Sequence, residues 1–347
     1  MAGKTTKSRR RGKKKPASKP SIIIAVIVVI IGALYYLWRQ NVIQSPNSIS
    51  DVLTQVTGEE PFVQAAPSDT TSESLPIRED ASFPSPPALD TLHVYSFNIQ
   101  IFGDSKMKKT EVVKVLVDIV SHADVMAIQE VRAISDEPVK AFMSKLDPKY
   151  DYVLGPREGR TASKEQYWVI YDTDKLEVKD RATFDDAEDW FQRSPMAVYF
   201  QTKDKFDFIL INNHIQPSDA AREISVLPEV IAYFQDKWGE RDVMVMGDFN
   251  ADGSYYNENN LIDVFPESDY LIILTNEYDT TVAGTEDVNT TYDRFIITDP
   301  AREDYTGNFG VIYYDKMYDF AALGIEPKQV SDHFPLWAEF WTTHDTD

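Results

Sequence analysis

The sequence predicts an α/β domain whose β-sheet is mixed, and three observations indicate this class. From residue 91 onward, short apolar runs of strand length recur and end in polar residues. Segments with apolar residues at helical spacing, such as residues 108–120, lie between some of these runs. Two runs, residues 196–201 and 206–212, are separated only by a short polar stretch around Lys203 and Asp204, which is typical of a hairpin. Helices that alternate with strands, combined with hairpins, favour a mixed sheet over an all-parallel one.

The chain is organised around residues 243–250, where an apolar run stops at Gly247 and continues into Asp248, Phe249 and Asn250. Side chains two residues apart in an extended chain point the same way, so Asp248 and Asn250 would lie side by side at the open end of a buried strand. Open α/β sheets place their chemistry at such strand ends, and oxygen ligands are what Mg²⁺ and Ca²⁺ prefer. A strand that simply ends in a polar turn is the competing interpretation.

The other elements follow in chain order. Helices are expected at residues 108–120, 138–146 and 219–238. The last of these would begin at an N-cap on Ser218 and end at Gly239, and Pro228 should kink it or split it in two. The expected strands are residues 92–99, 124–129, 150–154, 166–171, 175–179, 196–201, 206–212, 241–247, 292–298 and 335–341.

Charge and composition exclude several kinds of chemistry. The 347-residue chain has a net charge of −21, and because residues 1–40 carry +10 and residues 41–90 carry −7, residues 91–347 carry −24. So acidic a domain argues against binding of nucleic acid through a broad basic surface. A polyanionic substrate would need local arginines or metal ions to overcome the electrostatic repulsion. The chain has no cysteine, which excludes disulfides, zinc thiolates and thiol nucleophiles.

The N-terminal 90 residues are expected to tether the domain to a membrane. Residues 1–20 form a basic tail, and residues 21–38 form an uncharged stretch of 18 residues with aromatic residues at its end. A helix of that length spans about 27 Å, close to a bilayer core. The basic flank predicts a cytoplasmic N-terminus and a catalytic domain on the extracytoplasmic side. A cleaved signal peptide is the alternative, and it is disfavoured because the apolar run is too long for a typical signal peptide and no small-residue cleavage pattern follows at once.

Residues 39–90 are rich in Pro, Ser, Thr and acids, and the composition predicts a disordered linker. Residues 91–347 would then form the catalytic domain. Within it, apolar strands repeatedly border on acid, amide or histidine side chains, and each instance alone is an ordinary strand end. Taken together they suggest one rim of a sheet that could hold Mg²⁺, Ca²⁺ or Mn²⁺ rather than zinc and supply two imidazoles for proton transfer. These positions are Asn98, Glu130, His214, Asp248 with Asn250, Asp293, and Asp332 with His333.

Several motifs appear in the order and with the spacing of a known family. They are SFNI at residues 96–99 with Phe102-Gly103 after it, IQEVR at 128–132, KEQY at 164–167, RSP at 193–195, NHIQPSDA at 213–220, MGDFNAD at 246–252, YDR at 292–294 and SDH at 331–333. In these segments the chain resembles the endonuclease/exonuclease/phosphatase superfamily, and most closely its deoxyribonuclease I branch. The resemblance implies a four-layer sandwich of two packed mixed β-sheets flanked by helices, and it covers roughly residues 91–341.

The resemblance also implies roles for individual residues. His214 would pair with Glu165, and His333 with Asp293, on either side of the scissile phosphate. One pair would activate water and the other would protonate the leaving oxygen, in an order that we leave open. The implied catalytic set is Glu165, His214, Asp248, Asp293 and His333; the implied Mg²⁺ or Mn²⁺ ligands are Asn98, Glu130, Asp248 and Asn250 with Asp332 close by; and Arg132, Arg193 and Asn250 would contact the phosphate.

The chain departs from the family's pattern in two places. Ser163 stands where secreted members of the branch place a DNA-contacting tyrosine, so the groove contact is in question. The family's usual disulfides cannot form. Either a structural Ca²⁺ ion held by Asp279, Glu286 and Asp287 or a tighter loop around residues 275–290 would replace them.

The sequence thus predicts a membrane-anchored, monomeric, metal-dependent endonuclease that hydrolyses DNA, with the duplex as the expected substrate. A phosphodiesterase or phosphatase that acts on lipid head groups or other phosphoesters keeps the same rim and is the first alternative. A non-catalytic binding module that retains the fold is the second.

Overall fold

The computed structural model describes residues 75–78, 82–160, 164–282 and 289–343. Among these residues, no helix is both long and apolar enough to cross a membrane. The predicted basic tail, the predicted membrane segment at residues 21–38 and most of the predicted linker lie outside the described residues.

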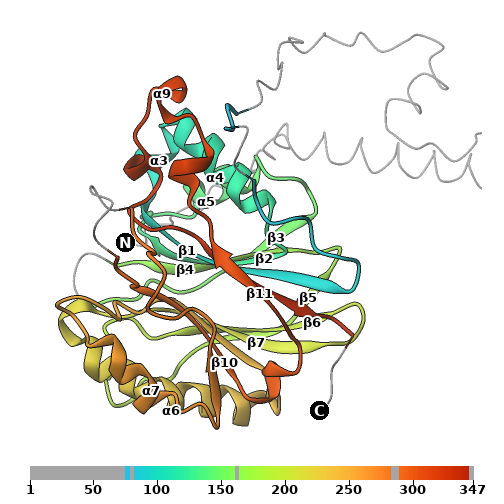
Figure 1. Cartoon of the computed structure of the whole chain (residues 1–347), viewed down its shortest axis with the longest axis vertical. Coiled ribbons are helices and arrows are strands. Elements are labelled where there is room, and N and C mark those ends of the chain that lie inside the picture. Colours follow the sequence, from blue (N-terminus) through green and yellow to red (C-terminus); the bar gives the residue numbers. More distant parts are fainter. Residues whose placement is uncertain (1–74, 79–81, 161–163, 283–288, 344–347) are drawn as a thin grey trace, which may run out of the picture. The chain divides into compact units, whose positions relative to one another are not determined.

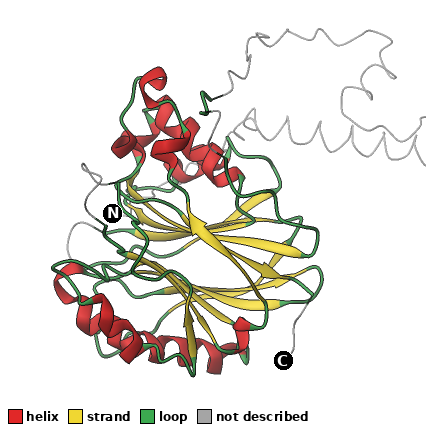
Figure 2. Ribbon diagram, viewed as in Figure 1, coloured by secondary structure: helices red, strands yellow, loops and turns green. Residues whose placement is uncertain are grey.

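Two mixed sheets stack face to face and helices cover their outer faces, which confirms the predicted four-layer sandwich (Figure 2). In the described part of the chain each sheet has six strands, in the orders β11-β12-β1-β2-β4-β3 and β5-β6-β7-β8-β10-β9. The first sheet contains β1 (Thr91–Phe102), β2 (Val125–Val131), β3 (Tyr150–Leu154), β4 (Gln166–Asp172), β11 (Tyr305–Val311) and β12 (Leu336–Trp341). The second contains β5 (Leu176–Thr183), β6 (Met196–Thr202), β7 (Asp207–His214), β8 (Val243–Asp248), β9 (Tyr270–Ile272) and β10 (Asp293–Thr298).

The helices lie in two groups, one over each sheet (Figure 1). Those over the first sheet include α3 (Asp104–Met107), α4 (Thr110–Ser121), α5 (Glu137–Met143) and α9 (Phe320–Leu323). In the sequence, α8 (Tyr314–Met317) precedes α9 and α10 (Pro327–Val330) follows it. Those over the second are α6 (Ala220–Trp238) and α7 (Leu261–Val264). Short 3₁₀ turns occur at Pro217–Asp219, Glu258–Asn260 and Pro300–Arg302.

Helix α6 corrects one prediction, because Pro228 does not split it. The helix runs unbroken to Gly239, whose φ of 77° ends it as expected. Its N-cap is Asp219 and not Ser218, because residues 217–219 form a separate 3₁₀ turn. The apolar face of α6 supplies the burial that keeps the helix continuous, with Ile224, Leu227 and Val230 fully buried against the second sheet.

Alternating side chains along the strands divide the interior into three apolar layers. On β8, Met244 and Met246 pack between the two sheets, while Val243 and Val245 pack toward α6. The outer face of the first sheet packs against α4 and α5. The central strands are therefore buried on both faces, and this explains their continuous apolar sequences.

The strand directions bring the polar ends of the central strands to one rim. The pairs β1–β2 and β7–β8 are parallel, so both members of each pair end at the same edge. Strand β10 is antiparallel to β8 and begins where β8 ends. The register places His214 beside Asp248 and Asp248 beside Asp293, in one row across the second sheet.

The described part of the predicted linker, residues 75–78 and 82–90, contacts the folded domain. Ile77 forms a β-bridge with Tyr318, and the ring of Phe83 stacks on His122 with centroids 3.7 Å apart. Leu75 and Phe83 also pack against the outer apolar layer of the first sheet. The prediction of a disordered linker rested on the overall Pro- and Ser-rich composition. It did not take account of the few apolar side chains that make these contacts.

Candidate active site

Asp248 stands at the centre of the rim, and the backbone around it permits only a narrow choice of residues. Gly247 precedes it with φ of 138°, and a Cβ atom there would lie 1.9 Å from the carbonyl oxygen of Asn213. Glycine is therefore required for β7 and β8 to approach at this point. Oδ1 of Asp248 accepts the backbone N–H of Asn250 at 2.9 Å, which leaves Oδ2 to face the other groups of the rim.

The first histidine–carboxylate pair joins β7 to the start of β4. Nδ1 of His214 lies 3.3 Å from Oε2 of Glu165, and its Nε2 lies 3.5 Å from Oδ2 of Asp248. The hydroxyl of Tyr167 accepts the backbone N–H of His214 at 2.9 Å, which fixes the end of the strand. Burial alone would raise the pKa of Glu165, but His214 together with Arg193 and Arg132 lowers it to about 2. The carboxylate is therefore ionised at neutral pH.

The second pair joins the loop before β12 to the start of β10. Nδ1 of His333 lies 2.7 Å from Oδ2 of Asp293, and its Nε2 lies 3.6 Å from the same Oδ2 of Asp248. Burial alone would lower the pKa of His333, but the carboxylates of Asp293 and Asp248 raise it to about 10. The Nε2 atoms of His214 and His333 thus both face Oδ2 of Asp248, although the two histidines are 119 positions apart in the chain.

The first sheet contributes Asn98 from β1 and Glu130 from β2. Nδ2 of Asn98 donates to Oε1 of Glu130 at 3.3 Å and to Oδ2 of Asp248 at 3.1 Å, so one amide links the two sheets. Oε2 of Glu130 accepts the backbone N–H of Ile101 at 3.0 Å. Glu130, Gln100 and Ile101 all have positive φ, a conformation that is uncommon outside glycine and that concentrates at functional sites.

Two arginines surround Glu165. Nε of Arg193 lies 2.8 Å from Oε1 of Glu165 and donates to the carbonyl of His214 at 3.0 Å. Its Nη2 is buried and has no hydrogen-bond partner among the described residues. Arg132 is more exposed; its Nη2 lies 3.1 Å from Oε2 of Glu130 and its Nε lies 3.8 Å from Oε2 of Glu165. The rim therefore holds two guanidinium groups in an otherwise acidic domain.

Two of the predicted site residues are placed less centrally. Nδ2 of Asn250 donates to the carbonyl of Ile215 at 3.0 Å, so its amide is engaged with backbone. The side chain of Asp332 is 45% exposed, and its Oδ1 lies 4.0 Å from Nε2 of His333. The structure thus joins Asn98, Glu130, Arg132, Glu165, Arg193, His214, Asp248, Asp293 and His333 through direct side-chain contacts, and it leaves Asp332 at the edge.

The donor set fits a hard divalent cation. Ligand atoms of Asp248, Asp293 and His333 lie within 4.8 Å of one another and are buried. Glu130 and Asp248 face the same Asn98 amide, so two carboxylates from different sheets are directed at one place. Carboxylate oxygens suit Mg²⁺ or Mn²⁺.

The described part of the loop at residues 275–290, where a structural Ca²⁺ ion is one expectation, shows one of the three proposed ligands. Oδ1 of Asp279 accepts the N–H and the hydroxyl of Thr281, so it serves a turn, and Glu286 and Asp287 lie outside the described residues. Ser163 also lies outside them.

Sequence reasoning missed the residues that hold the rim in place. Besides Tyr167, the hydroxyl of Ser331 donates to the carbonyl of Asn98 at 2.6 Å, and the hydroxyl of Thr280 accepts the N–H of Asp293 at 3.1 Å. Tyr167 lies in the KEQY motif and Ser331 in the SDH motif, so their position next to predicted site residues could have identified them as supporting residues. Thr280 lies in a polar loop with no motif, and nothing in its local sequence distinguishes it.

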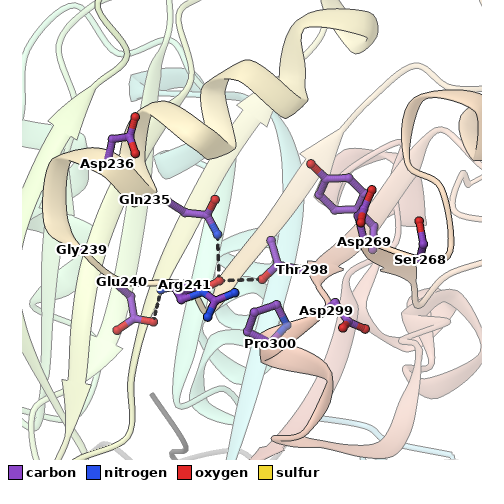
Figure 3. A pocket seen from close by; sticks show the side chains of 11 residues that line it. Gln235, Asp236, Gly239, Glu240, Arg241, Ser268, Asp269, Thr298, Asp299 and Pro300 are labelled. Atoms are coloured by element: carbon purple, nitrogen blue, oxygen red, sulfur yellow. Dashed lines mark hydrogen bonds between the residues drawn. The ribbon is translucent and has the colours of Figure 1, made fainter.

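A separate pocket of about 510 Å³ lies at the opposite end of β8, near the residues that precede the strand (Figure 3). Its lining includes Glu240, Arg241, Asp269 and Thr298. Gln235 and Thr298 both donate to the backbone carbonyl of Arg241, at 3.0 and 2.9 Å. None of the predicted site residues lines this pocket, so we place the chemistry at the rim.

Comparisons with known proteins agree with this architecture. A family model described as the Endonuclease/Exonuclease/phosphatase family matches residues 95–333, which is more than half of the chain. Deoxyribonuclease-1 of Oryctolagus cuniculus is 31% identical over 260 residues, covering 71% of this chain and 91% of that protein. Deoxyribonuclease-1 of Homo sapiens is 31% identical over 265 residues with the same coverage, and deoxyribonuclease gamma of Mus musculus is 28% identical over 261 residues, covering 71% and 83%.

Among solved structures, humanized D. rerio TDP2 superposes with a TM-score of 0.53 at 13% identity, covering 72% of this chain and 99% of that one. At that identity the likeness shows the fold alone. The family model and the relatives at 31% identity go further, and they confirm the resemblance seen in the motifs. The chain belongs to the endonuclease/exonuclease/phosphatase family.

Proposed function

We propose that this chain is a divalent-metal-dependent nuclease that hydrolyses phosphodiester bonds of DNA. The observation that carries the proposal is the pair of imidazoles, each held on Nδ1 by a carboxylate and each directing Nε2 at Oδ2 of Asp248. The likeness to deoxyribonuclease-1 of several mammals supports DNA as the substrate within the family.

In-line hydrolysis of a phosphodiester needs two proton transfers on opposite sides of phosphorus. Water loses a proton as it attacks, and the leaving oxygen gains one as its bond to phosphorus breaks. A carboxylate on Nδ1 fixes the imidazole tautomer and supports the imidazolium, so Nε2 is the atom that exchanges the proton. His214 with Glu165 and His333 with Asp293 supply one such group each, and either order of roles uses the same two pairs.

Charge on the phosphoryl oxygens also needs stabilisation. Arg193 has a buried Nη2 that finds no hydrogen-bond partner in the part of the chain that the structure describes, and Arg132 lies on the other side of Glu165. These guanidinium groups, with the Asn98 amide, would bind the non-bridging oxygens. Glu130 and Asp248 would hold Mg²⁺ or Mn²⁺, which when bound supplies further positive charge at those oxygens.

The test is hydrolysis of two substrates side by side by the purified chain. With Mg²⁺, supercoiled plasmid should be converted to nicked circles on a gel, and EDTA should stop the conversion. Phospholipid vesicles are assayed in parallel for release of phosphorylated head groups. Turnover of the phospholipid without nicking would reassign the activity to lipid phosphodiesters, and hydrolysis of neither substrate would reject the proposal.

A further inference from the structure

Glu223 is a fully buried carboxylate in the first turn of α6 that no motif identified. Its Oε1 accepts the backbone N–H of Gln192 at 2.7 Å, and its Oε2 accepts the backbone N–H of Gln216 at 2.8 Å. Both oxygens of one carboxylate are therefore engaged with backbone from two separate loops. Burial raises the pKa of Glu223 above its ordinary value, and the N–H groups of Gln216 and Gln192 oppose that shift, so the buried side chain depends on these two hydrogen bonds.

The two loops that Glu223 joins carry proposed site residues. Gln192 directly precedes Arg193, and Gln216 follows His214 by two positions. Arg193 closes the arrangement from the other side, because its Nε donates to the carbonyl of His214 at 3.0 Å and its Nη1 donates to Oε1 of Gln216 at 3.4 Å. The result is a ring of contacts that runs from Glu223 through one loop to Arg193, across to the His214 loop, and back to Glu223.

We propose that Glu223 is a positioning residue that fixes Arg193 and His214 relative to each other in the active site. This inference rests on the proposed function, since it assigns a purpose to the placement of those two side chains. Glu223 acts through backbone and touches neither imidazole nor guanidinium by hydrogen bond among the described contacts. Small misplacements of reacting groups are costly to catalysis, so a loosened loop should lower the rate well before the fold is lost.

The first experiment compares Glu223→Gln with Glu229→Gln, a control on an exposed position of the same helix. The amide of the glutamine variant can accept from only one of the two N–H groups. We expect kcat/KM on plasmid DNA to fall about tenfold or more for E223Q and less than about twofold for E229Q, with both variants folded by circular dichroism. Equal activity of the two variants would overturn the inference.

A double-mutant cycle separates positioning from a purely structural role. If Glu223 acts partly through Arg193, then E223Q should lower kcat/KM by a clearly smaller factor when Arg193 is already alanine, because only His214 is then left to be positioned. The same factor in both backgrounds would mean that the two residues act independently, and the inference would be wrong.

A second variant removes the hydrogen bond from the backbone side. Gln216 has φ of −74°, which proline adopts readily, so Gln216→Pro deletes the N–H at a compatible position. Gln216→Ala is its control, because it deletes the same side chain and keeps the N–H. We expect Q216P to be clearly less active than Q216A, and equal activity would contradict the proposal.

The failure of this inference can be distinguished from failure of the proposed function. All variants are also assayed on bis(4-nitrophenyl) phosphate, a simple phosphodiester, and the exchange of the Gln192 and Gln216 amide protons is followed by NMR. If the wild-type chain cleaves no DNA, the proposed function fails. The positioning role then stands if E223Q slows hydrolysis of the simple diester and speeds exchange at one or both of these amides, and it falls if hydrolysis or exchange is unchanged.

Discussion

At the scale of single residues, Oδ2 of Asp248 is the point where distant parts of the chain meet. The Asn98 amide, the His214 imidazole and the His333 imidazole approach it from β1, β7 and the loop before β12. A buried carboxylate without such partners would be strongly unfavourable, so these contacts stabilise the charge and at the same time gather the proposed reacting groups.

Glu165 should make the stability of the protein depend on pH. Its pKa falls from the ordinary 4.5 to about 2 in the folded protein. A group whose pKa is lowered by folding stabilises the fold above its unfolded value, and that contribution is lost as the pH falls from 4.5 toward 2. We expect Glu165→Gln to reduce the free energy of unfolding at pH 7 by about 3 kcal/mol, with a smaller difference at pH 3.

The measurement is urea unfolding in EDTA at pH 7, 5, 4 and 3. Glu177→Gln on the exposed side of β5 is the matched control and should change the free energy of unfolding little at any pH. A wild-type-to-E165Q difference that is the same at pH 7 and pH 3 would contradict the assigned interactions of Glu165.

At the scale of elements, the length and apolar character of the central strands made them predictable. Strand β8 lies within one or two residues of the predicted 241–247, and the β6–β7 hairpin lies where Lys203 and Asp204 placed it. Strand β11 was missed because its sequence, YTGNFGV, contains two glycines and no clear alternation. Helices α8 to α10 were missed because four residues are too few to show a helical period.

The sequence likewise predicted some features of the candidate site and missed others. Motifs identified the residues that contact one another at the rim, because each motif sits at the end of a strand. They could not show which contacts form between sheets, such as the bond from Asn98 to Asp248, since these depend on how the two sheets pack. They also missed buried supports such as Glu223 and Lys106, whose partners are backbone groups that carry no sequence signal.

Lys106 gives a prediction at this scale. It lies buried on α3, and Nζ donates to the carbonyls of Ile99 at 2.5 Å and Val330 at 2.7 Å, so it joins the end of β1 to the segment before His333. Burial lowers its pKa to about 8. We expect Lys106→Met to lower the free energy of unfolding by about 2 kcal/mol, because two buried carbonyls lose their donor.

Urea unfolding of K106M and of Lys108→Met, an exposed neighbour, checks this. The control should stay within about 0.5 kcal/mol of wild type. Equal stability of the two variants would mean that the buried ammonium contributes nothing to the joint.

At the scale of the whole molecule, the membrane anchor stays a prediction from residues 1–38 alone. We propose that the uncharged segment at 21–38 spans a membrane and that the basic residues before it keep the N-terminus in the cytoplasm. The full chain should then remain with membranes after carbonate extraction, and protease added outside should digest the catalytic domain. Release of the chain into the carbonate supernatant would contradict the anchor.

The whole molecule also explains why one site needs two sheets. Neither sheet alone holds both the pair of imidazoles and the Glu130–Asn98 unit, and packing the sheets face to face brings them to one rim. The large negative charge of residues 91–347 opposes the approach of a polyanion, so the proposed binding of DNA would rely on the few local arginines and on a bound divalent cation.

The most direct test of this account is plasmid nicking by His214→Ala and His333→Ala, each purified and shown to be folded. The account predicts that each substitution lowers the nicking rate by about a hundredfold or more in Mg²⁺, because each removes one of the two proton-transfer groups. Nicking at the wild-type rate by both variants would show that the two histidine–carboxylate pairs do not carry the reaction.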